Sequence, residues 1–120
     1  MIGSEGASCA QEIPRAEQIA RLNDAFRKTG QGGMIAFTRG VRSIKDFKVT
    51  ELLAALANYD SFDTDNDPHG ERDFGDIEVA GTSLLWKIDY YDKNTDFGSN
   101  DPADPDVTDR VLTVMLPEEW

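Results

Sequence analysis

Two stretches of the chain repeat their apolar residues at intervals of three and four, the spacing that gathers side chains on one face of a helix. The apolar side chains of the first stretch are Ile19, Leu22, Ala25 and Phe26. Pro14 suits the first turn of such a helix, and Gly30 suits its end because glycine adopts a left-handed conformation without strain. We therefore predict a helix over about residues 15–28.

The second helical stretch runs to about Tyr59, and either Ser43 or Asp46 can cap its start. Its apolar stripe consists of Val49, Leu52, Leu53 and Leu56. Phe62 is expected to pack just past its end. Lysine and glutamate side chains take the opposite side, so the pattern predicts an amphipathic helix packed on the core.

Four further stretches are apolar or alternate between apolar and polar residues, as strands do. They cover about residues 34–38, 76–80, 84–90 and 110–116. Gly40 suggests a bulge or an exit from the first strand, with residues 41–43 continuing it before the chain turns. A tight turn at Gly81 and Thr82 joins the next two strands into a hairpin, whose alternation places Trp86 in the core. The last strand is apolar on both faces, which predicts a central position in the sheet.

The predicted order of elements is therefore α-β-α-β-β-β. This order favours an α+β fold in which two helices pack on one face of a mostly antiparallel four-stranded sheet. A chain of 120 residues has room for a single domain. We predict a flexible N-terminal tail over residues 1–14, which are mostly small and polar, and one domain over residues 15–120.

The formal net charge of −11 is concentrated in the second half of the chain. Residues 1–59 carry eight basic and six acidic side chains (+2), whereas residues 60–120 carry four basic and seventeen acidic ones (−13). This balance argues against direct binding to nucleic acid or to anionic membranes, because both need cations facing phosphate. It favours a basic protein partner. The alternative is that the acids serve solubility alone.

The sequence favours a cytoplasmic protein without a cofactor. Cys9 is the only cysteine, so no internal disulfide can form. The first 14 residues lack the basic and apolar regions of a signal peptide, and no apolar run approaches the roughly 18 residues of a membrane span. The glycines at 30–33 follow a helix and precede a strand, the reverse of a phosphate-binding loop.

Two segments, residues 60–76 and the turn-rich residues 92–109, are predicted to form the working surface. The predicted partner-binding residues are Asp60, Asp63, Asp65, Asp67, Glu71, Asp73, Asp101, Asp104, Asp106 and Asp109. Asp63, Asp65 and Asp67 stand at alternate positions, so in an extended segment they lie about 7 Å apart, near the spacing of phosphates along a strand. An EF-hand does not fit, because proline replaces its glycine and phenylalanine its glutamate. Solvated acids that form turns are the alternative.

An alternative site is centred on the only histidine, His69. Asp67, His69, Glu71 and Asp73 recur with a period of two, so in an extended segment all four face one way, as a catalytic carboxylate–imidazole set would. Arg39 follows the first strand and can reach the acidic loop as a bidentate partner, or capture an anion. The alternative is structural, with His69 and Asp67 hydrogen-bonded to the loop backbone. We predict no metal site, because zinc here would need three carboxylates.

Several segments resemble an uncharacterised bacterial domain-of-unknown-function family of small proteins. The matching segments are IARLNDAFRKTGQGG (19–33), TRGV (38–41), DNDPHGERDFG (65–75), LLWKIDYYD (84–92) and DPADPDVTDRVLTVML (101–116). The resemblance covers most of the chain. It implies a protein of a kind often encoded on plasmids and integrated mobile elements, and it assigns no catalytic residue.

Three functional hypotheses follow from these patterns. The first is a non-enzymatic acidic binding protein, encoded on a mobile element, that occupies the basic nucleic-acid-binding surface of a host defence protein in the manner of an anti-CRISPR or anti-restriction inhibitor. The second is a small enzyme or metal-dependent site at His69, Glu71 and Asp73. The third is a structural homodimer that uses an uncovered sheet face. The acidic second half and the family resemblance favour the first, and the oligomeric state is left open.

Overall fold

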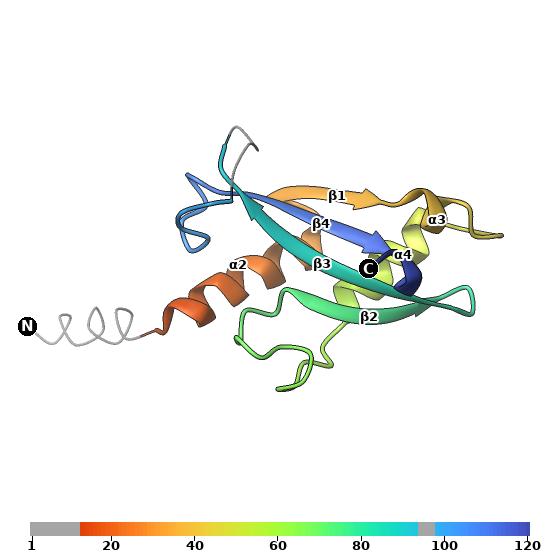
Figure 1. Cartoon of the computed structure of the whole chain (residues 1–120), viewed down its shortest axis with the longest axis horizontal. Coiled ribbons are helices and arrows are strands. Elements are labelled where there is room, and N and C mark those ends of the chain that lie inside the picture. The colour runs from red at the N-terminus through yellow and green to blue at the C-terminus, as the bar shows by residue number, and fades with distance from the viewer. Residues whose placement is uncertain (1–12, 94–97) are drawn as a thin grey trace, which may run out of the picture.

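A computed structural model describes residues 13–93 and 98–120. Its elements are α2 (Arg15–Thr29), β1 (Gly33–Phe37), α3 (Arg39–Arg42), α4 (Val49–Asn58), β2 (Phe74–Val79), β3 (Thr82–Tyr91), β4 (Asp109–Met115) and the 3-10 turn η1 (Pro117–Glu119). The predicted α+β class is confirmed (Figure 1). The predicted tail falls outside the described residues, apart from residues 13 and 14.

The four strands form one mixed sheet in the order β1-β4-β3-β2. β2 pairs with β3 and β3 with β4 in antiparallel fashion, whereas β1 runs parallel to β4. The central position predicted for β4 is therefore confirmed, and so is a mostly antiparallel sheet. Leu112 and Val114 are buried on one side of β4 and Val111 and Thr113 are half-buried on the other, which fits a strand with neighbours on both edges.

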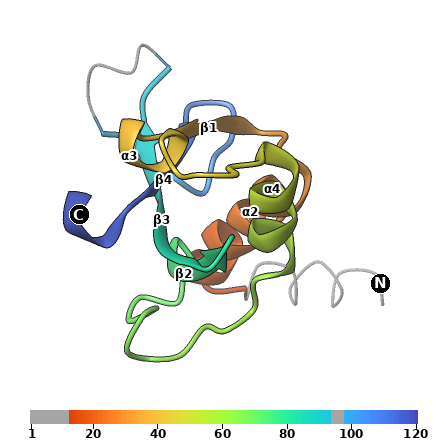
Figure 2. The same cartoon turned by 90° about the vertical axis from the view of Figure 1, so that its right-hand side faces the viewer.

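Helices α2 and α4 lie on one face of the sheet, as the edge-on view in Figure 2 shows. Trp86 on β3 is fully buried between the layers, as its alternation predicted. Its ring meets Tyr59 edge-on, with centroids 5.6 Å apart, at the end of α4. Gly75 packs closely against this pair, since a Cβ at this position would come within 2.6 Å of Tyr59 Cζ. The aromatic core therefore fixes where the chain leaves α4 and where it enters β2.

The second helix is shorter than predicted, and it is preceded by a separate helical turn. Asp46 has a φ of 64°, so no continuous right-handed helix can pass through it, and α4 begins only at Val49. Of the predicted stripe, Val49 and Leu53 remain 43% and 37% exposed, because only the Leu52–Leu56 line faces the sheet. The expected strand exit after Thr38 is instead α3, whose first turn is capped by the Thr38 hydroxyl.

On the opposite face of the sheet, the C-terminal turn η1 lies over part of the described strands (Figure 2). Trp120 lies there with its ring edge-on to Phe74 and the centroids 5.0 Å apart. The Thr38 hydroxyl donates to Glu119 Oε1 at 2.6 Å and ties η1 to the start of α3. Within the described residues, α2 and α4 do not cover this face, which carries the outward side chains of β2 and β3.

Candidate functional site

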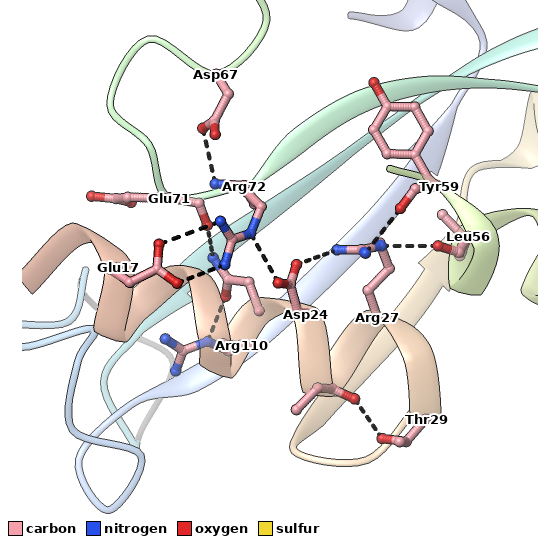
Figure 3. Close-up of polar contacts among 12 residues, drawn as sticks. Glu17, Asp24, Arg27, Thr29, Leu56, Tyr59, Asp67, Glu71, Arg72 and Arg110 are labelled. Atoms are coloured by element: carbon pink, nitrogen blue, oxygen red, sulfur yellow. Dashed lines mark hydrogen bonds and ion pairs between the residues drawn. The ribbon is translucent and has the colours of Figure 1, made fainter. Parts of the chain in front are cut away.

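A network of ion pairs fastens the loop between α4 and β2 to α2 (Figure 3). Arg72 Nε lies 2.9 Å from Asp24 Oδ2, and Arg72 Nη2 lies 3.1 Å from Glu17 Oε2. Asp24 in turn accepts from Arg27 Nη1 at 2.9 Å. Hydrogen bonds from Arg72 and then from Arg21 hold the pKa of Glu17 below its usual range. The loop is therefore positioned by cations of its own chain.

Beside this network, a buried polar chain connects the two acidic segments. Asn23 Nδ2 donates to the Glu71 carbonyl at 2.9 Å and to the Tyr90 hydroxyl at 2.8 Å, while Asn23 Oδ1 accepts from Arg110 Nε at 2.7 Å. Arg110 Nη2 also donates to the Pro102 carbonyl. Burial raises the pKa of Tyr90, so its hydroxyl stays protonated and donates to Glu71 Oε1 at 3.0 Å. Glu71 is thus directed inward.

Two carboxylates of the first acidic segment, those of Asp63 and Asp67, shape its loop. Asp63 Oδ1 accepts from the amides of Asp65 and Asn66, at 2.9 and 3.0 Å. The Asp67 amide donates to the Asp63 carbonyl at 2.8 Å, and Asp67 Oδ1 accepts from the Arg72 amide at 2.9 Å. The segment is a turn, so the prediction that Asp63, Asp65 and Asp67 match the pitch of phosphates along an extended strand is wrong. The competing expectation of turn-forming acids is confirmed for Asp63 and Asp67.

The second acidic segment lies apart from the first, and Figures 1 and 2 place the two loops toward opposite edges of the sheet. Asp101 pairs with Arg15 at 2.9 Å, and Asp109 pairs with Lys93 at 3.0 Å. Asp104 Oδ1 accepts from the Asp106 amide at 2.9 Å, a turn like that of Asp63. Residues 94–97 of the predicted loop fall outside the described residues. The structure therefore does not bring the predicted partner-binding residues into one patch.

Four exposed carboxylates do gather along the β2 edge and the loop before it: Asp63, Asp65, Asp76 and Glu78. We call this group the β2 acidic patch. Asp76 and Glu78 alternate along β2 with its buried residues. Burial raises the pKa of Tyr59, and the nearby charges of Asp76 and Asp63 raise it further. Within residues 13–93 and 98–120, no ion pair includes any of the four. Asp60 is also exposed, but it shares a hollow of about 580 Å³ with Arg27, Lys28 and Arg72.

A groove of about 430 Å³ adjoins the patch on the uncovered face of the sheet. We call it the His69 groove, and its walls include Asp65, His69, Asp73, Phe74, Asp89 and Trp120. Lys87 on its floor pairs with Asp89 at 3.0 Å.

The expectation that Asp67, His69, Glu71 and Asp73 face one way is wrong. Gly70 and Arg72 have φ values of 72° and 53°, so the segment is not extended, and Glu71 turns to Tyr90 instead of into the groove. Arg39 does not join His69 either, because α3 lies at the far end of the sheet (Figure 1).

A comparison with protein families matches residues 37–119 to DUF3768, a protein of unknown function. The match covers well over half of the chain. The chain belongs to the DUF3768 family. Comparisons with curated proteins and with solved structures give no match.

The DUF3768 match contains the whole β2 acidic patch and, apart from Trp120, the groove walls named above. Helix α2 lies before it, so the polar network joins the matched segment to a helix outside it. Asp76 fell within the predicted working surface without being named as a partner-binding residue, whereas Glu78 and Asp89 lie outside both predicted segments. Their alternation with buried neighbours already assigned them to the outer face of the sheet, whereas no pattern in the sequence indicated Trp120.

The described residues contain no group of three histidine, cysteine or acidic side chains placed to hold a metal ion. In the same part of the chain, no helix has the length and apolar character needed to cross a membrane.

Replacing Asp73 with asparagine is expected to stabilise the protein at neutral pH. Burial, followed by the charge of nearby Glu71, raises the pKa of Asp73. A carboxyl group whose pKa is raised in the folded protein stabilises the fold at low pH. This contribution is lost as the pH rises through the pKa of the folded state. Removing the charge should therefore raise the free energy of unfolding at pH 7 by roughly 0.5–1 kcal/mol.

Urea unfolding of the Asp73→Asn variant across pH measures this effect. The gain should vanish below the ordinary pKa of aspartate, where both proteins are uncharged at this position. Asp106→Asn is the control, because Asp106 is exposed and takes part in no ion pair of the described chain. A gain that persists unchanged in acid would contradict an electrostatic cause.

Proposed function

We propose that this DUF3768 protein is a non-enzymatic binding protein whose β2 acidic patch binds a basic surface on a protein partner. The observation that carries the proposal is the exposure of four carboxylates that form no ion pair with a cation in the part of the chain that the structure describes. Several basic side chains of the described chain pair with other acids: Arg15 with Asp101, Arg72 and Arg27 with the acids of α2, and Lys93 with Asp109. The negative potential of the patch is therefore available to a partner.

The fold supports this role because it holds the patch rigidly. Asp76 and Glu78 lie on a sheet strand, and the turn that carries Asp63 and Asp65 is tied down by Asn66. The side-chain nitrogen Nδ2 of Asn66 donates to the Ser61 carbonyl at 2.9 Å and to the Tyr59 hydroxyl at 3.0 Å. Charges that are already ordered lose little conformational entropy when they bind. A fixed patch can therefore select its partner by position as well as by sign.

A basic surface of this kind is typical of proteins that bind nucleic acid. We extend the proposal to a host defence protein of that class, inhibited by a DUF3768 protein encoded on a mobile element. Because residues 63–67 form a turn, their carboxylates do not match the spacing of phosphates along a strand, and the proposal does not include that match. What remains is complementarity of charge between the patch and the partner's phosphate-binding surface.

Affinity capture from a lysate of the native host, across a salt series, tests the proposal. Captured protein should elute as salt rises, because screening weakens exposed charge pairs. The Asp63→Asn/Asp65→Asn variant should recover roughly fivefold less partner, since each exposed pair contributes up to about 1 kcal/mol.

The matched control is Asp104→Asn/Asp106→Asn. It makes the same change in net charge at a turn of the same geometry, on the other acidic segment. Partner recovery that falls equally in both variants would show a general charge effect and would overturn the assignment to the patch. Recovery unaffected by salt and by both variants would overturn the proposed function.

A further inference from the structure

The His69 groove combines aromatic and acidic walls on the sheet face opposite α2 and α4. Trp120 is 69% exposed and stands beside Phe74, so one wall presents aromatic rings to solvent. The carboxylates of Asp65, Asp73 and Asp89 line the same groove. An exposed aromatic ring close to carboxylates is the environment that receives cationic side chains, through cation–π contact and charge-assisted hydrogen bonds.

The charges of the groove are not balanced within the chain. Three carboxylates face one ammonium group, that of Lys87, which Asp89 already binds at 3.0 Å. Asp73 is half-buried, and in the described part of the chain no salt bridge includes it. Glu71 and Asp67 add further negative potential around it. A cation entering the groove would therefore find a half-buried carboxylate that has no salt bridge in the described chain and whose charge only His69, on the same groove wall, partly opposes.

The chain itself shows how a guanidinium fits such a site. Arg27 lies over the ring of Phe62 at 5.3 Å while pairing with Asp24, and Arg110 lies over Tyr90 at 5.2 Å. Both combine an aromatic face with oxygen acceptors. The planar guanidinium stacks and donates in a fixed fork, which the ammonium of lysine cannot do.

We propose that the His69 groove binds an arginine side chain of a protein partner, with the guanidinium on the Trp120–Phe74 wall and hydrogen-bonded to Asp73. This inference rests on the proposed function, and it names the side chain that the basic partner presents. A second copy of the chain is a poor occupant, because two molecules of net charge −11 repel each other.

Titration with an N-acetylated, C-amidated tetra-arginine peptide tests the groove directly. Calorimetry gives the affinity, and tryptophan fluorescence reports the site because Trp120 is exposed whereas Trp86 is fully buried. We expect binding to change the emission of Trp120. Trp120→Ala and Asp73→Asn should each weaken binding about tenfold, whereas Trp120→Phe should retain most of it because the aromatic face remains. Tetra-lysine should bind more weakly than tetra-arginine.

Asp104→Asn is the control, with the same loss of charge outside the groove. Equal weakening in Asp104→Asn and Asp73→Asn, or unchanged affinity in Trp120→Ala, would overturn the groove as the site. Thermal melts confirm that each variant is folded, as expected for the exposed Trp120. If Trp120→Ala and Asp73→Asn bind normally while Asp63→Asn/Asp65→Asn loses its partner, the groove inference alone fails. If capture is insensitive to salt and charge, the proposed function fails.

Discussion

Replacing Arg27 with alanine is expected to lower the free energy of unfolding by about 3–5 kcal/mol, the scale for removing one partner from a buried ion pair. Arg27 is only 3% exposed, and its guanidinium makes three hydrogen bonds. Nε donates to the Leu56 carbonyl at 2.9 Å, Nη2 to the Tyr59 carbonyl at 3.0 Å, and Nη1 to Asp24 Oδ1 at 2.9 Å.

The two carbonyls belong to the C-terminal end of α4, where backbone oxygens lack partners within the helix. Arg27 therefore completes the end of α4 from α2 and, at the same time, packs against the rings of Phe62 and Trp86. Alanine removes all of these contacts and takes the guanidinium donor from the buried Tyr59 carbonyl, whereas the Leu56 carbonyl still accepts from the Tyr59 amide at 3.3 Å. Arg27→Lys should recover only part of the loss, because one ammonium group cannot reach all three acceptors in the geometry of the guanidinium.

Chemical denaturation followed by circular dichroism measures the change. Arg21→Ala is the matched control: it lies on the same helix and pairs with Glu17 at 3.1 Å, but its side chain is 61% exposed. That substitution should cost no more than about 0.5 kcal/mol. Similar losses for Arg21→Ala and Arg27→Ala would show that burial of the guanidinium does not matter, contrary to this account.

Arg27 also illustrates what the sequence could and could not predict. The spacing of Ile19 and Phe26 identified α2, and the alternation around Trp86 identified β3 and the buried face of the sheet. Asn23 and Arg27 are polar, so the apolar pattern that identified α2 gave no sign that they are buried. Their burial depends on acceptors supplied by distant segments, and a local pattern does not contain that information.

The candidate site likewise has features that the sequence predicts and features that it does not predict. Its acidic character follows from composition, and the outward positions of Asp76 and Glu78 follow from strand alternation. The direction of Glu71 does not, because it depends on left-handed backbone at Gly70 and Arg72. Arginine rarely adopts that conformation, and here its side chain is held by two acids of α2. Tertiary ion pairs thus overrode the extended conformation on which the period-of-two argument depended.

Replacing Asn23 with alanine is expected to destabilise the protein by roughly 2–4 kcal/mol, because it leaves more than one buried polar group without a partner. Asn23 is fully buried and bonds the Glu71 carbonyl, the Tyr90 hydroxyl and Arg110 Nε. Arg110 is 3% exposed, and burial lowers its pKa. Loss of an acceptor should therefore be costly for this cation in particular.

The location of Asn23 makes a second effect measurable. It lies between the loop that contains Glu71 and the loop whose Pro102 carbonyl accepts from Arg110. Hydrogen exchange of Asn23→Ala should thus show faster exchange in both loops, including the amides of Arg72 and Asp104. Gln18→Ala, an exposed position on the same helix, should leave both loops unchanged. Because the β2 acidic patch depends on the first loop, faster exchange confined to the Pro102 loop would show that Asn23 does not position the patch.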